Sequence, residues 1–340
     1  MEYENLNTVA EEFFTTKNFD LCKSVLEECS QHKFIVSFEF VSLGSNEIYI
    51  IKKHKKEVLF IFDIDLPLHP YRIVLAKHWI HSAKLTIKAL AHLSVDDAEC
   101  IINLGDYGTE PGFAFSDHRI EFPLIPDPIF IMTNGYSEYK NFYANQKEFE
   151  SKKDALFWRG ATTGFTDLFG ADSKSWETIA RVQLCKFCYE RKSEVEMDVY
   201  LSNLVQIPED NKKEVIDSGL VKDSVDWKTF IDYKYQIDID GNSNSWPGLF
   251  LKLLTSSPVL KIDSALGFRQ WYYDRLIPWH NYIPIKKDLS DLVPTVDWLN
   301  NHPMVAKEIG RNGYNLAASM TNNSELIFMI KTLSRCNKLS

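Results

Sequence analysis

The segment 232–285 holds the densest group of residues that could bind a charged ligand. An apolar run predicts a strand that ends at Asp238 and Asp240, and the small polar residues 241–245 follow it. A helical pattern begins directly afterwards. A strand, a short polar loop and a helix start present backbone N–H groups to a phosphate. The same residues also fit an ordinary turn in which Ser245 caps the helix, so both interpretations stay open.

A second stretch, "ALFWRGATTG", repeats this layout. The apolar run delivers Arg159 and Gly160 to a loop that holds Thr162, Thr163 and Gly164. The planar guanidinium of an arginine at a strand end donates paired hydrogen bonds to a diphosphate. The alternative is a surface arginine paired with an acid.

Two Asp-x-Asp pairs could hold a divalent metal beside a nucleotide sugar. They are Asp63 with Asp65 and Asp238 with Asp240. Side chains two apart on a strand share one face, which suits a metal, but acids at strand ends more often cap the next loop. Leu249 occupies the position where a calcium-binding loop needs a glutamate. We therefore expect no metal site.

Several catalytic signatures are absent from the sequence. It contains no GxSxG, HExxH, P-loop or GxGxxG motif, which argues against the usual hydrolases, zinc proteases, NTPases and dehydrogenases. The pair Cys185 and Cys188 lies in a helical stretch without a second cysteine pair. We expect both to pack in the core rather than to bind zinc or act in redox chemistry.

Charge and composition restrict the partners. The 340 residues carry a formal net charge of −9, so we expect no nucleic-acid partner. The N-terminal residues lack the basic and apolar regions of a signal peptide, no stretch is apolar enough to span a membrane, and the six cysteines show no disulfide spacing. These features predict a soluble, cytoplasmic protein.

The elements that position these loops follow from periodicity. We expect a helix over 4–30, three strands between 33 and 65, a long helix from 71 to 93 and a strand near 100. Beyond residue 153, strands alternate with helices over 173–191, 247–256, 288–301 and 303–335, which predicts an α/β protein with a doubly wound parallel sheet. We place an N-terminal α/β domain at 1–150, a ligand-binding domain at 151–325 and a C-terminal tail at 326–340.

The segment 232–292, with "FWRGATTG" and "IPDPIF" upstream, resembles glycosyltransferase family 90, the capsule and lipopolysaccharide group that includes protein O-glucosyltransferases. With "INLGDY" and "HPMVAKEIGRNGY" the resemblance covers roughly residues 100–320. It implies a GT-B-like fold of two Rossmann-type domains with a cleft between them, an inverting reaction, and no metal or other cofactor. By that analogy Arg159 meets the donor diphosphate, and the other donor-binding residues are Gly160, Thr162, Asp240, Gly241, Ser245, Trp246, Phe250, Lys252, Asp274 and Arg275.

The resemblance also guides the choice of a catalytic base. An inverting transfer needs a carboxylate that takes the proton of the acceptor hydroxyl. Family members place an acid shortly before the segment "IPDPIF", and we choose Glu121, with Asp117 as the substitute. Glu121 as a plain surface residue remains the alternative. Asp274 and Arg275 either bind the nucleotide or pair with each other.

The sequence thus predicts a glycosyltransferase that moves a hexose or pentose from a UDP-sugar to a saccharide of lipopolysaccharide or capsule. The residue before Phe250 is Leu249, where secretory members commonly carry arginine, and this favours the bacterial branch, with Lys252 supplying the charge. A lipid-linked acceptor would bring the protein to the inner face of the cytoplasmic membrane. The alternative is a catalytically silent scaffold that binds carbohydrate or nucleotide.

Overall fold

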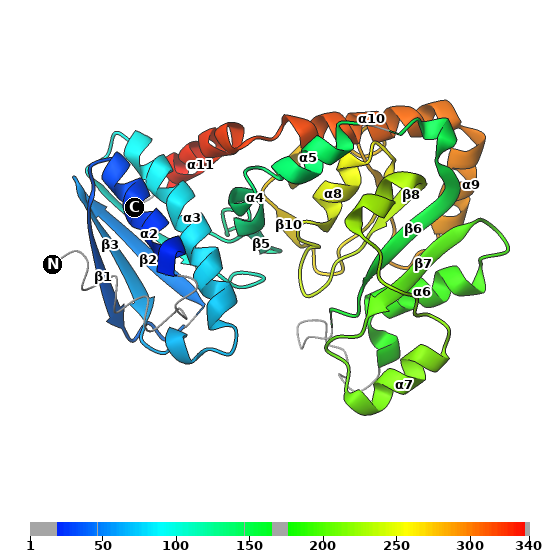
Figure 1. The fold of residues 1–340 in the computed structure, drawn as a ribbon, viewed down its shortest axis with the longest axis horizontal. Coiled ribbons are helices and arrows are strands. Elements are labelled where there is room, and N and C mark those ends of the chain that lie inside the picture. Colours follow the sequence, from blue (N-terminus) through cyan, green and yellow to red (C-terminus); the bar gives the residue numbers. More distant parts are fainter. Residues whose placement is uncertain (1–18, 46, 146, 165–175, 337–340) are drawn as a thin grey trace. The chain divides into compact units, whose positions relative to one another are not determined.

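The computed structural model describes residues 19–45, 47–145, 147–164 and 176–336 and divides the chain into two compact units (Figure 1). Unit 1 comprises Met1–Tyr136, Arg269–Trp271 and Met320–Ser340, and unit 2 comprises Ser137–Phe268 and Tyr272–Ser319. This division differs from boundaries at residues 150 and 325. The polar segment after Tyr136 belongs with unit 2, and two later segments return to unit 1, which a linear reading of the chain does not reveal.

Unit 1 is built on a four-stranded mixed sheet in the order β1-β3-β2-β4. Strand β1 pairs parallel with β3, whereas β2 runs antiparallel to both β3 and β4. The sheet is therefore not wholly parallel as in a Rossmann domain, because short turns join β1 to β2 and β2 to β3. The strands are β1 (Ile35–Val41), β2 (Ile48–His54), β3 (Glu57–Asp63) and β4 (Asp97–Asn103).

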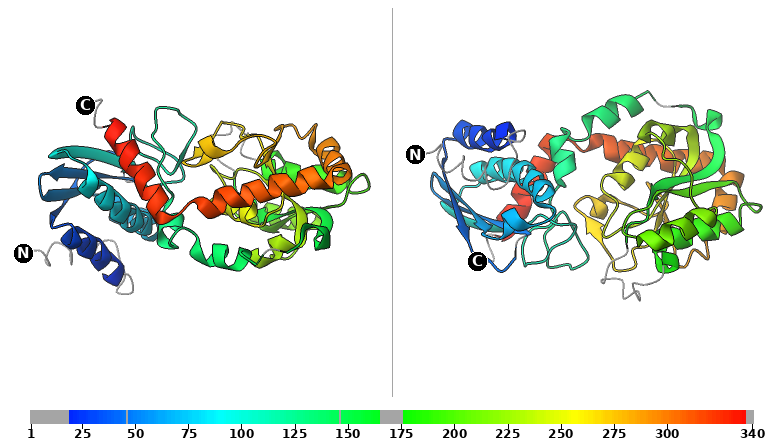
Figure 2. Two further views of the ribbon diagram at one scale, coloured as in Figure 1. Left: turned by 90° about the horizontal axis from the view of Figure 1, so that it is seen from above. Right: turned by 60° about the horizontal axis from the view of Figure 1, so that its bottom comes forward.

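The long helix α3 (Arg72–His92) lies along this sheet and contacts α2 (Phe19–Gln31) and α11 (Asn322–Cys336) (Figure 2). Trp79 of α3 meets the rings of Phe60 and Phe62 edge to face, 5.9 and 5.2 Å between centroids. A short helix, α4 (Pro128–Met132), also packs on α3. The buried side of α3 thus supplies the core of unit 1, as its long apolar pattern predicts.

Two short strands tie distant parts of the sequence together within unit 1. Strand β5 (Ser116–Asp117) pairs antiparallel with β10 (Arg269–Gln270). Next to β10, the Trp271 indole donates a buried hydrogen bond of 2.8 Å to the Glu325 carboxylate of α11. These contacts explain why the C-terminal segment belongs with unit 1 rather than forming a separate tail.

Unit 2 contains a five-stranded sheet in the order β11-β9-β8-β6-β7, and every pairing is parallel. Helices connect the first four of these strands in chain order, so the predicted α/β fold with a parallel sheet is confirmed. The strands are β6 (Lys153–Ala161), β7 (Met197–Asn203), β8 (Tyr233–Asp238), β9 (Val259–Ile262) and β11 (Ile283–Ile285).

The helices of unit 2 follow the predicted alternation with two exceptions, the first being α7, a helix that the sequence analysis did not predict. The segment predicted as one helix over 303–335 is two, because α10 ends at Ser319 and α11 begins at Asn322. Thr321 and Ser324 cap the new start by exchanging backbone-to-side-chain hydrogen bonds. The α-helices are α5 (Ser137–Tyr143), α6 (Ala180–Glu190), α7 (Glu209–Asp217), α8 (Gly248–Leu254), α9 (Leu292–Asn301) and α10 (Pro303–Ser319). The 3-10 turns are η2 (Leu66–Leu68), η3 (Phe149–Ser151), η5 (Trp176–Thr178), η6 (Trp227–Asp232) and η7 (Tyr273–Arg275).

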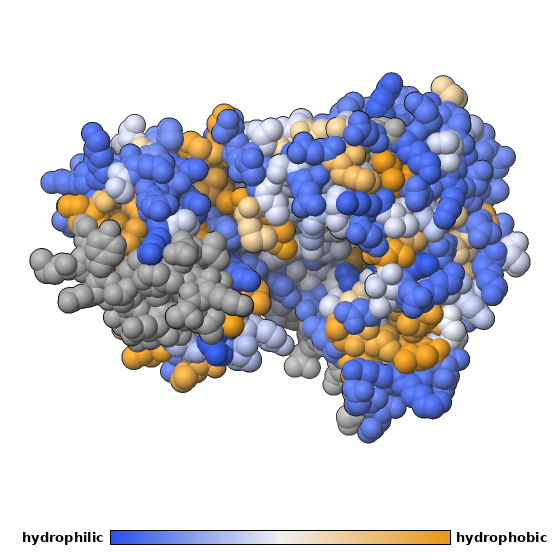
Figure 3. Space-filling model, in the orientation of Figure 1, coloured by the Kyte–Doolittle hydropathy of each residue, from blue (hydrophilic) through white to orange (hydrophobic). Residues whose placement is uncertain are grey.

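The face of the protein in Figure 3 is mainly hydrophilic, with hydrophobic residues gathered in separate patches. Within the described part of the chain, no helix has the length and apolar character needed to cross a bilayer.

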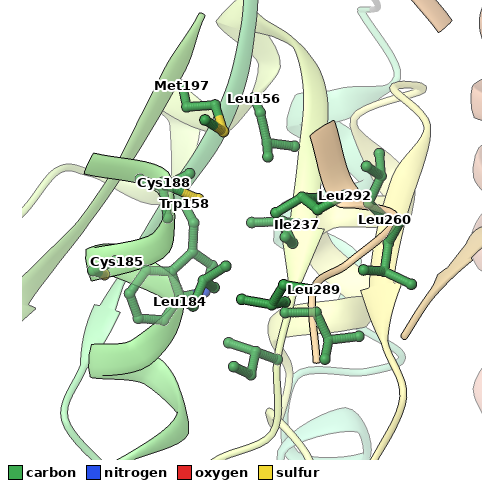
Figure 4. Packing of buried hydrophobic residues seen from close by; sticks show 14 of the residues in the cluster. Leu156, Trp158, Leu184, Cys185, Cys188, Met197, Ile237, Leu260, Leu289 and Leu292 are labelled. Atoms are coloured by element: carbon green, nitrogen blue, oxygen red, sulfur yellow. The ribbon is translucent and has the colours of Figure 1, made fainter. Parts of the chain in front are cut away.

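The main core of unit 2 fills the space between the sheet and helices α6 and α9 (Figure 4). Cys185 and Cys188 of α6 lie in this core together with Leu156 and Trp158 of β6. Burial raises the pKa of the Cys188 thiol to about 12, which keeps it protonated and unreactive. The prediction that the cysteine pair packs in the core is confirmed.

Candidate functional site

The candidate site lies where the strand order of the parallel sheet reverses. From β6 the chain goes to β7 on one side, and β8 then pairs with the other side of β6. Open α/β sheets bind ligands beside the carboxyl ends of their strands at such a switch point. The two loops singled out in the sequence, after β6 and after β8, both begin at this edge.

These two loops contact each other. The Gly164 N–H donates to the Asn242 side-chain oxygen at 3.0 Å. Gly164 has φ +115°, and a Cβ there would lie 3.4 Å from the Gly241 carbonyl oxygen. The positive φ therefore favours glycine at position 164, whereas the space there would accept a Cβ in ordinary contact.

A cavity of about 300 Å³ opens beside this contact. Its walls come from the ends of β6, β8 and β9 and from the start of α6, and they combine apolar side chains with a few polar groups, as small-molecule sites do. The residues that line it include Thr163, Gly164, Ile179, Ala180, Asp240, Gly241, Ser264 and Lys287.

A second cavity of about 100 Å³ lies on the α8 side of the β6 end. Three basic residues line it, Arg159, Arg181 and Lys252, together with Gly160 and Ser245. Arg159 and Lys252, which the sequence suggested independently, thus face one shared cavity. Gly241 lines the larger cavity instead.

Arg159 is held by protein groups. Its guanidinium donates to the Asp198 carboxylate at 2.7 Å and to the backbone oxygens of Trp158 and Asp198. The rings of Phe157 and Tyr200 flank it. Arg159 is therefore paired with an acid, but its side chain is only 7% exposed and so is not the surface arginine of the alternative interpretation. Contact with a diphosphate would require Arg159 to exchange Asp198 for the phosphate, and its donor role stays a prediction.

Arg181 of α6 is a candidate that motif reasoning missed. It is buried and donates to the backbone oxygens of Ala161, Ile239 and Asp240 and to the Thr163 hydroxyl, so it holds the ends of β6 and β8 together. Because Thr163 lines the larger cavity and Arg181 the smaller one, Arg181 links the two. The sequence does hold a signal for Arg181. It stands four residues before Cys185 and seven before Cys188, so this charged side chain lies on the same side of the helix as two residues predicted to be in the core.

Further charges are buried beneath the site. Lys252 donates to Asp238 at 2.6 Å, and Lys261 lies 3.7 Å from Asp238 and 3.6 Å from Asp240, which is longer than a hydrogen bond. Burial opposes ionisation of Asp238, but Lys252 and Lys261 outweigh it, so the pKa of Asp238 lies below its usual value. With Arg181, basic side chains outnumber carboxylates here, which favours an anionic ligand.

Other predicted donor-site residues are structural in their contacts. The Thr162 hydroxyl exchanges hydrogen bonds with the backbone of Val205. Phe250 is buried against the ring of Tyr272. Trp246, Asp274 and Arg275 are not among the side chains that line the two cavities, and Asp274 is exposed. The structure does not bring these residues to the cavities with the others.

The two candidate bases both lie in unit 1. Asp117 is inaccessible to solvent and accepts hydrogen bonds from the Gly108 and Arg119 N–H groups and from the Arg119 guanidinium. Burial opposes ionisation, but these donors together hold the pKa of Asp117 below its usual range. Glu121 is exposed and borders a hollow of about 950 Å³ on the sheet of unit 1. Both assignments stay predictions.

The Asp-x-Asp carboxylates have protein partners. Asp63 accepts from the backbone N–H groups of Leu43 and Asp65, so it caps the turn after β3. Asp238 pairs with Lys252 as described. Within the described residues there is no cluster of three His, Cys, Asp or Glu side chains arranged for a metal ion.

A doubly wound parallel sheet with a basic cavity at its switch point defines a class of ligand-binding α/β domains, and sequence comparison specifies the family. Residues 138–340, more than half of the chain, match the pattern of "Glycosyl transferase family 90". The chain belongs to glycosyl transferase family 90.

Individual relatives agree with this. Protein O-glucosyltransferase 3 from Homo sapiens is 26% identical over 269 residues, which are 74% of this chain and 49% of that protein. Protein O-glucosyltransferase 2 from Danio rerio is 33% identical over 168 residues, 49% of this chain and 29% of that protein. The chain thus spans about half or less of the length of these curated relatives.

Similar solved structures include TarM, with a TM-score of 0.38 and 11% identity, covering 56% of this chain and 36% of that one. The Anabaena protein Alr3699/HepE in complex with UDP has a TM-score of 0.38 and 9% identity, covering 59% of this chain and 55% of that one.

Proposed function

We propose that this protein is a glycosyltransferase that moves a sugar from a UDP-sugar to a hydroxyl acceptor with inversion. The observation that carries the proposal is the pair of cavities at the switch point, linked by Arg181. We assign the nucleoside to the larger cavity and the diphosphate to the smaller one, which three basic residues line. Family membership supports the reaction class, and the choice of uridine rests on the family resemblance.

The reaction requires one bond to form as another breaks. The acceptor oxygen attacks the anomeric carbon, the bond from that carbon to the phosphate oxygen breaks, and UDP leaves with the bonding electrons. The acceptor proton passes to a carboxylate, for which Glu121 remains our choice and Asp117 the substitute. Basic side chains stabilise the charge that develops on the departing diphosphate.

Two classes of acceptor hydroxyl are considered, those of a saccharide and those of a protein side chain. Sequence features favour a saccharide of lipopolysaccharide or capsule, whereas the relatives named above are protein O-glucosyltransferases. We propose the saccharide. Release of UDP should be measured with oligosaccharide acceptors and, in parallel, with folded serine-containing protein domains; turnover with the protein domains alone would replace the saccharide proposal.

We also propose a reaction without metal or other cofactor, in the cytoplasm. Of the Asp-x-Asp carboxylates, Asp238 is paired with Lys252 and Asp63 caps a turn in unit 1. The described cysteines Cys29, Cys185 and Cys188 are buried and not in disulfides, which supports a reducing compartment. Turnover should persist in excess EDTA, and its loss with recovery on adding Mn²⁺ would contradict the metal-free proposal.

The nucleoside assignment is tested by filling the larger cavity. Ala180 lines it at the start of α6 and is exposed, so Ala180→Trp blocks the cavity without disturbing the core. We expect the Kd for UDP, measured by calorimetry, to rise at least about tenfold, a loss of ~1.4 kcal/mol. The control is Ala144→Trp, at an exposed alanine of unit 2 outside both cavities. Equal UDP binding by the two variants would refute the assignment.

One observation favours a silent scaffold as the second candidate function. Arg181 and Asp117 are hydrogen-bonded by protein groups, and the terminal nitrogens of Arg159 donate to protein oxygens, although its Nε has no partner. A scaffold would bind UDP or a glycan without releasing nucleotide from a UDP-sugar. Turnover that disappears in Glu121→Gln, with UDP binding retained, would exclude it.

A further inference from the structure

An exposed apolar surface lies at the turn between β3 and α3 of unit 1. Large hydrophobic side chains, which most soluble proteins bury, are exposed there, and the exposed fraction is 80% for Leu68 and 68% for Tyr71. Large exposed apolar patches mark interaction sites rather than ordinary surface. The apolar tip, as we call it, comprises Val41, Ile64, Leu68, Tyr71, Ile73 and Val74.

The tip is held rigidly by the backbone beneath it. The Ile64 N–H donates to the Val41 carbonyl at 2.9 Å, and the buried Asp63 carboxylate accepts from the Leu43 and Asp65 N–H groups. Leu66 is buried and anchors the turn η2 from which Leu68 projects. Because these bonds fix the turn, the apolar side chains are presented outward without an ordering cost at the moment of contact.

The charge beside the tip differs from that of the protein as a whole. The chain carries a net charge of −9, yet the 21 residues of α3 include one arginine, three lysines and no acid. Lys77, Lys84 and Lys88 recur at seven and four residues, which places them on one side of the helix. Lys88 is paired with Glu28 at 3.3 Å, and the exposed Arg72 and Lys77 lie nearest the tip. The exposed Asp65 is the acid within the turn itself.

We propose that the apolar tip and the basic side of α3 dock unit 1 on an anionic lipid bilayer. Leu68 and its neighbours enter the boundary between headgroups and acyl chains, while Arg72 and Lys77 meet lipid phosphates, as in interfacial amphipathic segments. Charge complementarity selects this occupant, because cations beside exposed apolar side chains match a surface that is both anionic and apolar, and an anionic bilayer combines these properties. The contact is independent of the donor site in unit 2.

Binding of the full chain to vesicles tests the proposal. We expect flotation with vesicles of phosphatidylcholine containing about one-third phosphatidylglycerol, and at least about tenfold weaker binding to phosphatidylcholine alone. Each cation near an anionic surface raises the constant for binding to the vesicles by a factor of about five. The double variant Arg72→Gln with Lys77→Gln should therefore bind the anionic vesicles about 30-fold more weakly. No flotation with the anionic vesicles, or the same binding to both compositions, overturns the proposal.

The apolar contribution has its own variant and control. Leu68→Ser with Val74→Ser should lower the lipid partition coefficient at least about tenfold, with UDP affinity and melting temperature unchanged. The matched control is Ile216→Ser with Met304→Ser, two exposed apolar residues of unit 2. If the control variant shows an equal drop in the lipid partition coefficient, the proposal is overturned. Light scattering that shows a dimer which the tip variant dissociates, while vesicle binding is absent, also overturns it.

Discussion

At the scale of single residues, the site depends on which basic side chains are already paired with protein groups and which can still interact with a ligand. Arg181 and Lys252 are buried and fully engaged, and Lys261 stands too far from Asp238 and Asp240 to form a hydrogen bond with either. A buried cation in this position gains most from an additional anion. Lys261 lines neither cavity, so a diphosphate in the smaller one would meet Arg181 and Lys252 directly, with Lys261 adding positive charge behind them.

The choice between the two carboxylates is a prediction at this scale. Glu121→Gln should lower turnover by about 10² or more with UDP affinity unchanged, because an amide accepts no proton. Asp117→Asn removes the charge that faces Arg119 and should destabilise unit 1 by about 3 kcal/mol. Turnover and thermal unfolding are measured on both variants.

The contrary result would exchange the two roles. If Asp117→Asn keeps its melting temperature and loses turnover while Glu121→Gln remains active, Asp117 is the base and the Arg119 pair orients it. Glu121 would then be a surface residue of the hollow on unit 1, the alternative that the sequence left open.

At the scale of elements, α10 packs closely against the turn between α8 and β9, at the edge of the parallel sheet opposite the one that carries the site. Gly310 of α10 meets this turn, and a Cβ at Gly310 would lie 2.4 Å from the Ser256 carbonyl oxygen. We expect Gly310→Ala to lower the free energy of unfolding by about 1–3 kcal/mol, because the backbone must move apart.

Denaturant unfolding of unit 2 checks this prediction against a matched change in the same helix. Asn315 of α10 is exposed, and Asn315→Ala should leave stability unchanged or slightly raised, since alanine favours helix. A Gly310→Ala protein as stable as the Asn315→Ala protein would show that α10 does not pack as described.

At the scale of the whole molecule, stability should depend on pH through Lys152. This lysine is buried and donates to the Thr255 carbonyl and the Ser257 hydroxyl, which joins the start of β6 to the same turn. Burial lowers its pKa to about 7 from the usual 10.5. The unfolded chain therefore binds a proton that the folded chain lacks between these pH values.

It follows that stability rises with pH above 7 and is lowest below it, because protonating Lys152 in the fold is unfavourable. Between pH 8 and 9.5 the slope of unfolding free energy against pH should exceed that of Lys152→Met by about 1.4 kcal/mol per pH unit. Urea titrations of both proteins over this range measure the slopes, and parallel slopes would contradict the prediction.

Short-range patterns in the sequence determined much of the secondary structure of this protein. Apolar runs and helical periods located the strands of unit 2, most of its helices but not α7, and the two loops at strand ends, because these features depend on residues near one another in the chain. The parallel sheet then follows, since crossover helices leave few other topologies. The packing of Cys185 and Cys188 was predictable for the same reason.

Only the tertiary structure decided the rest, because it depends on contacts between residues far apart in sequence. The Asp198 partner of Arg159 lies 39 residues away, and no local pattern distinguishes such a pair from a free arginine. The same holds for Arg181, which reaches the end of β8, and for the return of 269–271 and 320–340 to unit 1. Periodicity shows which side of an element is buried, and the fold alone shows which distant group it meets.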